Sequence, residues 1–178
     1  MYLNYINILR WNRGVIMKKL FLLLCVVSLA FLIACGGKQV QSVNPDEIWV
    51  RAANSELSNH SIGGFAYKRS DLSMNNWNSW AQKSAPVISR ILTELPGGYV
   101  LQVTGHTDAS GPETQEGSKP GNIKLSEDRA KTVHDSLVKN KLDSPKLTRK
   151  GVGSSQPIDA VDSRDAKQRR VSFRIVQE

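Results

Sequence analysis

Alternating hydrophobic and polar positions predict the strands of this chain. In residues 99–105 (YVLQVTG), Leu101 and Val103 occupy alternate positions, as expected for a strand with one buried face. A similar pattern near the carboxyl end places Val171 and Phe173 on one face and the intervening Ser172 on the other. The segments that we predict as strands are residues 65–68, 99–105, 146–153 and 169–176.

Helical spacing recurs in three segments, which are residues 44–57, 75–95 and 124–142. The first has strong start signals, because Asn44 can cap a helix and Pro45 suits the first helical position. In the second, Pro86 should restart or kink the helix, since proline removes a donor and clashes with the preceding turn. In the third, we expect Ser126 to act as the cap, which places Arg129 in the first turn.

After the helix at residues 44–57, the predicted order is strand, helix, strand, helix, strand, strand. Alternation of strands and helices is typical of an α/β fold in which helices cover one face of a small sheet. The polar, Gly- and Pro-containing loop at residues 110–122 borders the end of a predicted strand. A mobile loop at that place is a common position for a binding site.

The amino-terminal segment has the pattern of an export signal. Lys18 and Lys19 precede an uncharged apolar run, residues 20–33, that is shorter than the roughly 20 residues needed to cross a bilayer. Met17 lies directly before the lysines, so residues 1–16 are candidates for an incorrectly assigned start. We therefore predict a signal peptide at residues 1–34.

The apolar run ends in LIAC, residues 32–35, which resembles the lipobox of bacterial lipoproteins. That resemblance implies cleavage before Cys35 and lipidation of its thiol. Several acyl chains would anchor the chain stably in a membrane. The alternative is an uncleaved anchor that continues through Gly37. The predicted organisation is a lipidated Cys35, tether and short helix at residues 35–61, followed by a domain at residues 62–178.

The net charge of +8 is concentrated at the amino end. Beyond residue 34 the chain has 20 basic and 16 acidic residues and lacks any Lys/Arg-rich run. A mild, dispersed charge of this kind argues against nucleic acid as a partner.

Polar residues with opposite charges follow the strand at residues 99–105. Asp108 lies just beyond its carboxyl end, and Arg129 lies in the helix that comes next. Ligands of α/β sheets commonly bind beyond strand ends, near free N–H groups of helix termini. A guanidinium and such amides favour a carboxylate, whereas Asp108 favours a cation. The pair therefore suits an amino-acid-like group that has both a carboxylate and an ammonium.

Catalysis and metal binding have weaker support. His60, His106 and His134 do not have the spacing of metal ligands. We expect His106 to be packed or hydrogen-bonded, and Ser126 to be a cap because it lacks a nucleophile context. We predict no metal, no cofactor and no enzymatic activity.

Four ordered motifs carry a family resemblance: GHTD at 105–108, NIKLSEDRA at 122–130, GVGSSQPI at 151–158 and QRRV at 168–171. Together they resemble the OmpA-like C-terminal domain, over roughly residues 65–176, and the leader and long loop look most like spirochaetal outer-membrane lipoproteins. The resemblance implies a two-layer α/β sandwich, βαβαββ in order, with helices on one small mixed sheet. It also implies peptidoglycan binding, in which Asp108 holds the ammonium and Arg129 the carboxylate of the stem-peptide diamino acid. The predicted binding residues are Thr107, Asp108, Asn122, Ser126, Arg129 and Arg169.

The sequence departs from the family pattern in several places. Extra residues lie around 117–121, between the Asp and Asn motifs. Gln168 replaces the asparagine of the usual NRR motif, and Phe65 is followed by Ala66 where the family has Phe-Asp. Asp165 replaces an arginine when the motifs are aligned without a gap, whereas Arg164 lies directly beside that position. These departures affect ligand detail and affinity, whereas Asp108 and Arg129 are intact.

The function implied is an outer-membrane lipoprotein that binds peptidoglycan non-covalently and tethers the membrane to the cell wall. The alternative is a surface-exposed adhesin that binds host extracellular proteins. A wall-acting enzyme and a flagellar-stator component are disfavoured. The diamino acid can be diaminopimelate or ornithine, which lacks the second carboxylate, and the sequence does not distinguish them.

Overall fold

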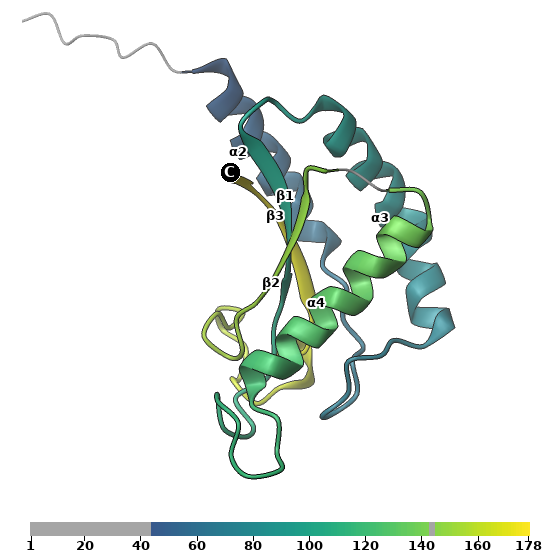
Figure 1. Ribbon diagram of the computed structural model, residues 1–178. Helices are drawn as coiled ribbons and strands as arrows, with labels where there is room; N and C mark the ends of the chain where they lie inside the picture. The colour runs from purple at the N-terminus through teal and green to yellow at the C-terminus, as the bar shows by residue number, and fades with distance from the viewer. Residues whose placement is uncertain (1–43, 143–144) are drawn as a thin grey trace, which may run out of the picture. The chain divides into compact units, whose positions relative to one another are not determined.

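The computed structural model describes residues 44–142 and 145–178, and Val43–Glu178 form one compact unit. The predicted signal peptide, Cys35 and the tether up to residue 43 lie outside the described residues. The helices are α2 (Pro45–Leu57), α3 (Met74–Glu94) and α4 (Asn122–Lys139), with short 3-10 turns at η1 (Ser58–His60) and η2 (Ala166–Gln168). The strands are β1 (Tyr99–Gly105), β2 (Leu147–Gly151) and β3 (Val171–Gln177) (Figure 1).

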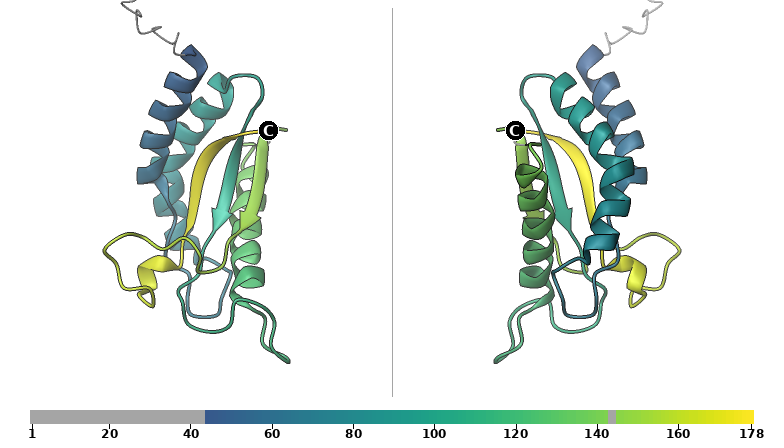
Figure 2. Two further views of the ribbon diagram at one scale, coloured as in Figure 1. Left: turned by 90° about the vertical axis from the view of Figure 1, so that its left-hand side faces the viewer. Right: turned by 90° about the vertical axis from the view of Figure 1, so that its right-hand side faces the viewer.

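The three strands form one mixed sheet in the order β2-β1-β3. β1 runs parallel to β2 and antiparallel to β3, with Leu101 opposite both Leu147 and Ile175. Helices α3 and α4 lie on the same side of this sheet, and α2 lies beside β3 (Figure 2). The α/β class and the mixed sheet predicted from the sequence are confirmed.

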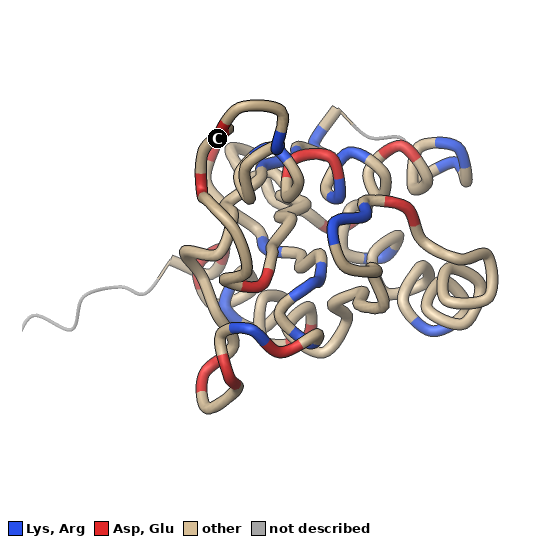
Figure 3. Tube along the Cα trace, turned by 90° about the horizontal axis from the view of Figure 1, so that it is seen from below, with Lys and Arg blue, Asp and Glu red and all other residues tan. Residues whose placement is uncertain are grey.

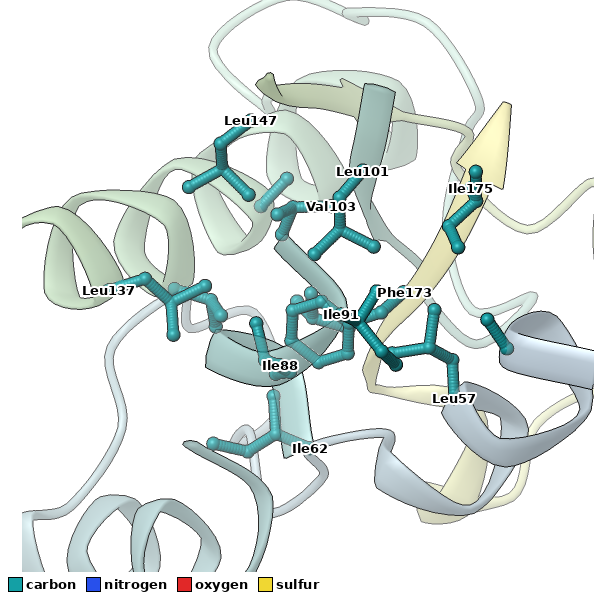
Figure 4. Close-up of a cluster of buried hydrophobic side chains, with 14 of the residues drawn as sticks. Leu57, Ile62, Ile88, Ile91, Leu101, Val103, Leu137, Leu147, Phe173 and Ile175 are labelled. Atoms are coloured by element: carbon teal, nitrogen blue, oxygen red, sulfur yellow. The ribbon is translucent and has the colours of Figure 1, made fainter. Parts of the chain in front are cut away.

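The core lies between the sheet and the helices. Leu101, Val103 and Phe173 point from the strands toward Ile88 and Ile91 of α3 (Figure 4). Trp80 of α3 stacks on Phe173 with ring centroids 5.5 Å apart, as expected for a sheet-packing residue. These contacts explain why alternate residues of the strands had to be apolar.

Helix α2 packs on the same domain, against β3. Asn44 caps it as predicted, accepting a hydrogen bond from the Asp46 N–H. The side chain of Asn54 donates to the carbonyl oxygen of Ile175 (3.1 Å) and accepts from its N–H (2.7 Å). Asn54 thus pairs with the open edge of β3 much as another strand would, and fixes α2 there.

One local prediction, the strand at residues 65–68, is wrong. No strand forms at Phe65–Lys68; instead Ile62 makes an isolated bridge with Val171, and the chain then turns at Tyr67 and Lys68. Pro86 does not restart the helix, because α3 continues through it as one element. Pro86 is exposed, so water can solvate the carbonyl oxygen that loses its donor. Within the described ranges, no helix is long and apolar enough to span a membrane.

Candidate functional site

The candidate site lies at one end of the sheet, where three loops meet. These loops follow η1, β1 and β2 in the chain and lie at the lower end in Figures 1 and 2. Figure 3 looks onto this end, where charged segments of both signs lie among the loops. The end of β1 packs closely against α4, because a Cβ on Gly105 would lie 1.9 Å from the backbone oxygen of Ser126. Only glycine allows β1 to pass the helix so closely.

A pocket of about 370 Å³ opens between the loop after η1, the loop after β1 and helix α4. It contains four of the six predicted binding residues, Thr107, Asp108, Asn122 and Arg129. The full lining consists of Tyr67, Lys68, Thr107, Asp108, Ser110, Gly111, Pro112, Lys119, Pro120, Asn122, Leu125 and Arg129.

Asp108 is buried and already has a cationic partner. Its Oδ2 lies 2.8 Å from Nη1 of Arg169, and its Oδ1 accepts from the Ser110 N–H at 3.0 Å. Burial raises the pKa of the carboxyl, but the hydrogen bonds from Arg169 and Ser110 outweigh it and leave the pKa below its usual value. Asp108 is therefore ionised at neutral pH. Arg169 is not part of the pocket lining and contacts the site only through its ion pair with Asp108.

Arg129 is the largest fully buried side chain. Its Nε donates to the carbonyl oxygen of Arg69 (2.9 Å), Nη1 to that of His106 (2.8 Å) and Nη2 to that of Ala66 (3.4 Å). Burial is the main cause that lowers its pKa, to about 10, so the guanidinium stays charged at neutral pH. Among the described residues, Arg129 has no ion-pair partner, although the negative charge of Asp108 raises its pKa and so favours the charged form of the guanidinium.

The start of α4 differs from its prediction. The helix begins at Asn122, with Gly121 as its cap residue, so Arg129 lies seven positions beyond the first residue and not in the first turn. Ser126 is inside the helix and is not its cap: its hydroxyl donates to the Ile123 carbonyl and accepts from the Gly153 N–H. Ser126 is absent from the pocket lining and joins α4 to the loop after β2.

The loop after β1 caps the helix in place of Ser126. The Asn122 N–H donates to the Pro112 carbonyl (2.8 Å), and the Ile123 N–H donates to the Glu113 carbonyl (3.1 Å). Those two amides are consequently not free for a ligand, contrary to expectation. The carboxylate of Glu113 also accepts hydrogen bonds from the Asn122 side chain and from Ser154, which fixes the loop on both sides.

Two further residues explain departures in the sequence motifs. Gln168 is fully buried, and its side chain hydrogen-bonds the backbone of Ile158, Val161 and Asp162, which holds the loop after β2. Asp165 caps the 3-10 turn η2 by accepting from the Lys167 N–H. Both substitutions therefore have structural roles in this chain.

His106 is packed and hydrogen-bonded, as predicted. Its Nε2 lies 2.8 Å from the Ser172 hydroxyl, and burial, with the charge of Arg170, lowers its pKa to about 3. The ring is therefore neutral at physiological pH. Among the described residues no cluster of three or more His, Cys, Asp or Glu side chains is placed to hold a metal ion.

Sequence reasoning missed the residues that the flanking loops add to the pocket, among them Tyr67, Lys68 and Lys119. The extra loop was visible as an insertion, but loop residues lack the periodicity that shows which way a side chain points. Lys119 lines the pocket from a loop that the hydrogen bonds of Glu113 tie to the start of α4.

Three solved structures are similar to this chain, and the first of them supports the fold. The peptidoglycan-associated lipoprotein of Burkholderia pseudomallei superposes with a TM-score of 0.52 at 17% identity, over 71% of this chain and 98% of that one. The OmpA-like domain of FopA1 from Francisella tularensis has a TM-score of 0.48 at 25% identity, over 65% and 69% of the two chains. The C-terminal domain of Helicobacter pylori MotB has a TM-score of 0.49 at 18% identity, over 66% and 85%.

Sequence comparison gives one short match and one family. The chain is 31% identical over 103 residues to the photosystem I P700 chlorophyll a apoprotein A2 of Gloeobacter violaceus, covering 52% of this chain but only 11% of that protein. The profile of the OmpA family matches residues 79–170, more than half of the chain and most of the site described above. The chain therefore belongs to the OmpA family.

Proposed function

We propose that the pocket binds the peptidoglycan stem peptide non-covalently, at the end of the diamino acid that has a free ammonium and a free carboxylate. In this proposal the chain is a lipid-anchored tether between the outer membrane and the cell wall. Membership of the OmpA family supports it, as do the chemical groups that line the pocket.

The single observation that carries the proposal is the buried charge of Arg129. Burying a guanidinium without an opposite charge is unfavourable, and within the described residues this one has carbonyl oxygens as its hydrogen-bond partners and the Phe65 ring 5.3 Å away, but no carboxylate in an ion pair. A guanidinium has five N–H donors, so one on Nη1 and one on Nη2 remain for a ligand. A carboxylate entering the pocket would neutralise the charge and accept both.

Asp108 supplies the opposite requirement. Each of its carboxylate oxygens has one protein hydrogen bond and can accept another, from an ammonium in the pocket. The buried hydroxyl of Thr107 also lines the pocket and has no hydrogen-bond partner among the described residues. A buried polar group of this kind is costly unless a ligand or water satisfies it. The three groups together favour a zwitterionic ligand.

The anchor completes the proposed role. Lipidation at Cys35 would hold the chain in the outer membrane, and residues 36–44 would link it to α2. The Burkholderia pseudomallei protein, whose name describes a peptidoglycan-associated lipoprotein, shares the fold. A modest affinity for each copy would suffice, because many anchored copies would bind one wall together. The role requires binding and involves no bond chemistry.

The test is co-sedimentation of the full chain, purified in detergent, with isolated sacculi. We expect wild type to sediment, and Asp108→Asn and Arg129→Lys to remain largely in solution. Asp135→Asn and Arg149→Lys are matched controls, because they make the same chemical changes on the outer face of α4 and β2 and should sediment like wild type.

Equal sedimentation of the pocket variants and the controls would reject the pocket as the wall site. Failure of wild type to sediment would reject wall binding altogether and favour the adhesin. Circular dichroism of each variant establishes that it is folded.

A further inference from the structure

The pocket has more positive charge than a single zwitterion can neutralise. Lys68, Lys119 and Arg129 line it, against the one carboxylate of Asp108, which is already bound to Arg169. Within residues 44–142 and 145–178, neither lysine takes part in an ion pair. After a ligand carboxylate has met Arg129 and an ammonium has met Asp108, both lysines would still face the ligand.

Lys119 comes from the loop that this chain adds to the family pattern. The loop contains a tight turn in which Glu116 and Lys119 exchange two backbone hydrogen bonds, of 3.2 and 3.0 Å. It packs closely on the start of α4, because a Cβ on Gly121 would lie 2.4 Å from the Glu113 carbonyl oxygen. The Glu113 carboxylate then bonds Asn122 and Ser154. These contacts hold the backbone of Lys119 at the pocket rim.

The turn that contains Lys68 is held by the buried Arg129. The carbonyls of Ala66 and Arg69, on either side of it, accept hydrogen bonds from Arg129. Lys68 itself has a φ of 57°, a left-handed conformation that costs energy in a residue other than glycine, and its Nζ lies 5.1 Å from the centre of the Tyr67 ring. The arginine that would bind the ligand carboxylate thus also fixes the turn that carries the second cation.

We propose that Lys68 and Lys119 form a second anion subsite, which binds a further carboxylate of the same stem peptide. This inference rests on the proposed function and specifies its ligand as one with at least two free carboxylates, of which Arg129 binds one. A stem peptide has such groups outside its diamino acid, at the D-glutamate branch and at the carboxyl terminus. Neutralising them by amidation would weaken binding to this pocket.

The experiment is calorimetric titration of the full chain in detergent with a synthetic stem tetrapeptide and with its amidated forms. One form is amidated at the D-glutamate carboxylate and the other at the carboxyl terminus. For wild type we expect one amide to bind about three- to tenfold more weakly than the parent peptide, the effect of losing partly exposed ion pairs. The Lys119→Gln variant should bind the parent peptide more weakly by a similar factor. It should bind the parent peptide and that amidated form with equal affinity.

Two further variants sharpen the result. Lys119→Arg keeps the charge and should restore the preference, and Lys68→Gln should reduce it. Lys131→Gln changes an exposed lysine outside the pocket lining and should behave like wild type. In a double-mutant cycle, the losses from Lys119→Gln and from amidation should overlap, because both remove one interaction.

The outcomes separate this inference from the proposed function. If wild type binds the parent peptide and Lys119→Gln keeps both affinity and preference, the second subsite is rejected while wall binding stands. The second subsite is also rejected if the fold-losses in affinity from Lys119→Gln and from amidation multiply in the double-mutant cycle, because the two changes then act independently. If wild type binds none of the peptides, both proposals fall.

Discussion

Two regions of this protein contain close pairs of opposite charges, and their surroundings differ. On the outer face of α4 and β2, Asp135 meets Lys131 and Arg149, with these side chains 47–56% exposed. At the pocket end, Asp108 meets Arg169 with side chains 4% and 18% exposed, and Arg129 beside them is fully buried. Each of these two clusters has two cations near one carboxylate, so this count by itself does not distinguish the buried cluster from the exposed one.

Solvation explains the difference. Water screens the exposed pairs, so each contributes little to the free energy of folding. In the pocket, desolvation makes each unmatched charge costly, and the protein offsets that cost with directed carbonyl and amide hydrogen bonds. One positive charge of the buried group still has no counterion among the described residues. This imbalance, and not the pairing, points to an anionic ligand.

The largest effect expected from this comparison is on stability. Arg129→Met removes the donor for three carbonyl oxygens from the Ala66–Arg69 turn and from His106. We expect the free energy of unfolding to fall by about 3 kcal/mol. Urea denaturation at pH 7 measures it. A loss below about 1 kcal/mol, similar to that of a surface pair, would remove the distinction between the two regions.

A pH-dependent effect of intermediate size is expected at Asp108. Its pKa is lower in the folded state than the value of about 3.9 for the unfolded chain. The stability that it contributes is therefore present above pH 4 and is lost as the pH falls through the folded pKa. Asp108→Asn should cost about 2 kcal/mol at pH 7, because it leaves the buried guanidinium of Arg129 and the partly buried one of Arg169 without a carboxylate.

Urea denaturation of wild type and Asp108→Asn between pH 2.5 and 7 tests that sign. The difference between the two proteins should shrink as the pH falls below 4. A difference that stays constant, or grows in acid, would contradict the assigned role of the Asp108 carboxylate.

The smallest effect is expected in the exposed region. Asp135→Asn removes the carboxylate shared by Lys131, His134 and Arg149, yet should change the free energy of unfolding by no more than about 0.5 kcal/mol. Adding 0.5 M NaCl should erase the change, because salt screens exposed pairs. A loss as large as that at Asp108 would show that exposure is the wrong criterion.

Prediction from the sequence succeeded where local pattern and tertiary packing agree. Strand β1 has the predicted bounds, Tyr99–Gly105, because its alternating residues meet the core on one face. Helix α2 begins where Asn44 and Pro45 indicated. In both, neighbouring residues contain the deciding information: the period of the apolar positions and the cap.

Prediction failed where residues distant in the sequence determine the local structure. Ser126 and the acids after it have the pattern of a helix start, but backbone carbonyls of the preceding loop cap α4 earlier, at Gly121. The expected strand at Phe65–Lys68 is a turn instead. Its carbonyls bond Arg129 and Arg169, which follow much later in the chain. Local secondary-structure propensity depends on neighbouring residues and contains no information on hydrogen-bond partners that lie far away in the sequence.

The sequence by itself determined the class of fold, the order of most elements, the family, and two charged residues of the pocket lining, Asp108 and Arg129. Only the tertiary structure decided which charges are matched. It paired Asp108 with Arg169, left Arg129 with carbonyl partners, and brought Lys68 and Lys119 from separate loops to one pocket. The physical reason is that spacing along the chain specifies which residues share an element, whereas burial and charge balance depend on which elements meet.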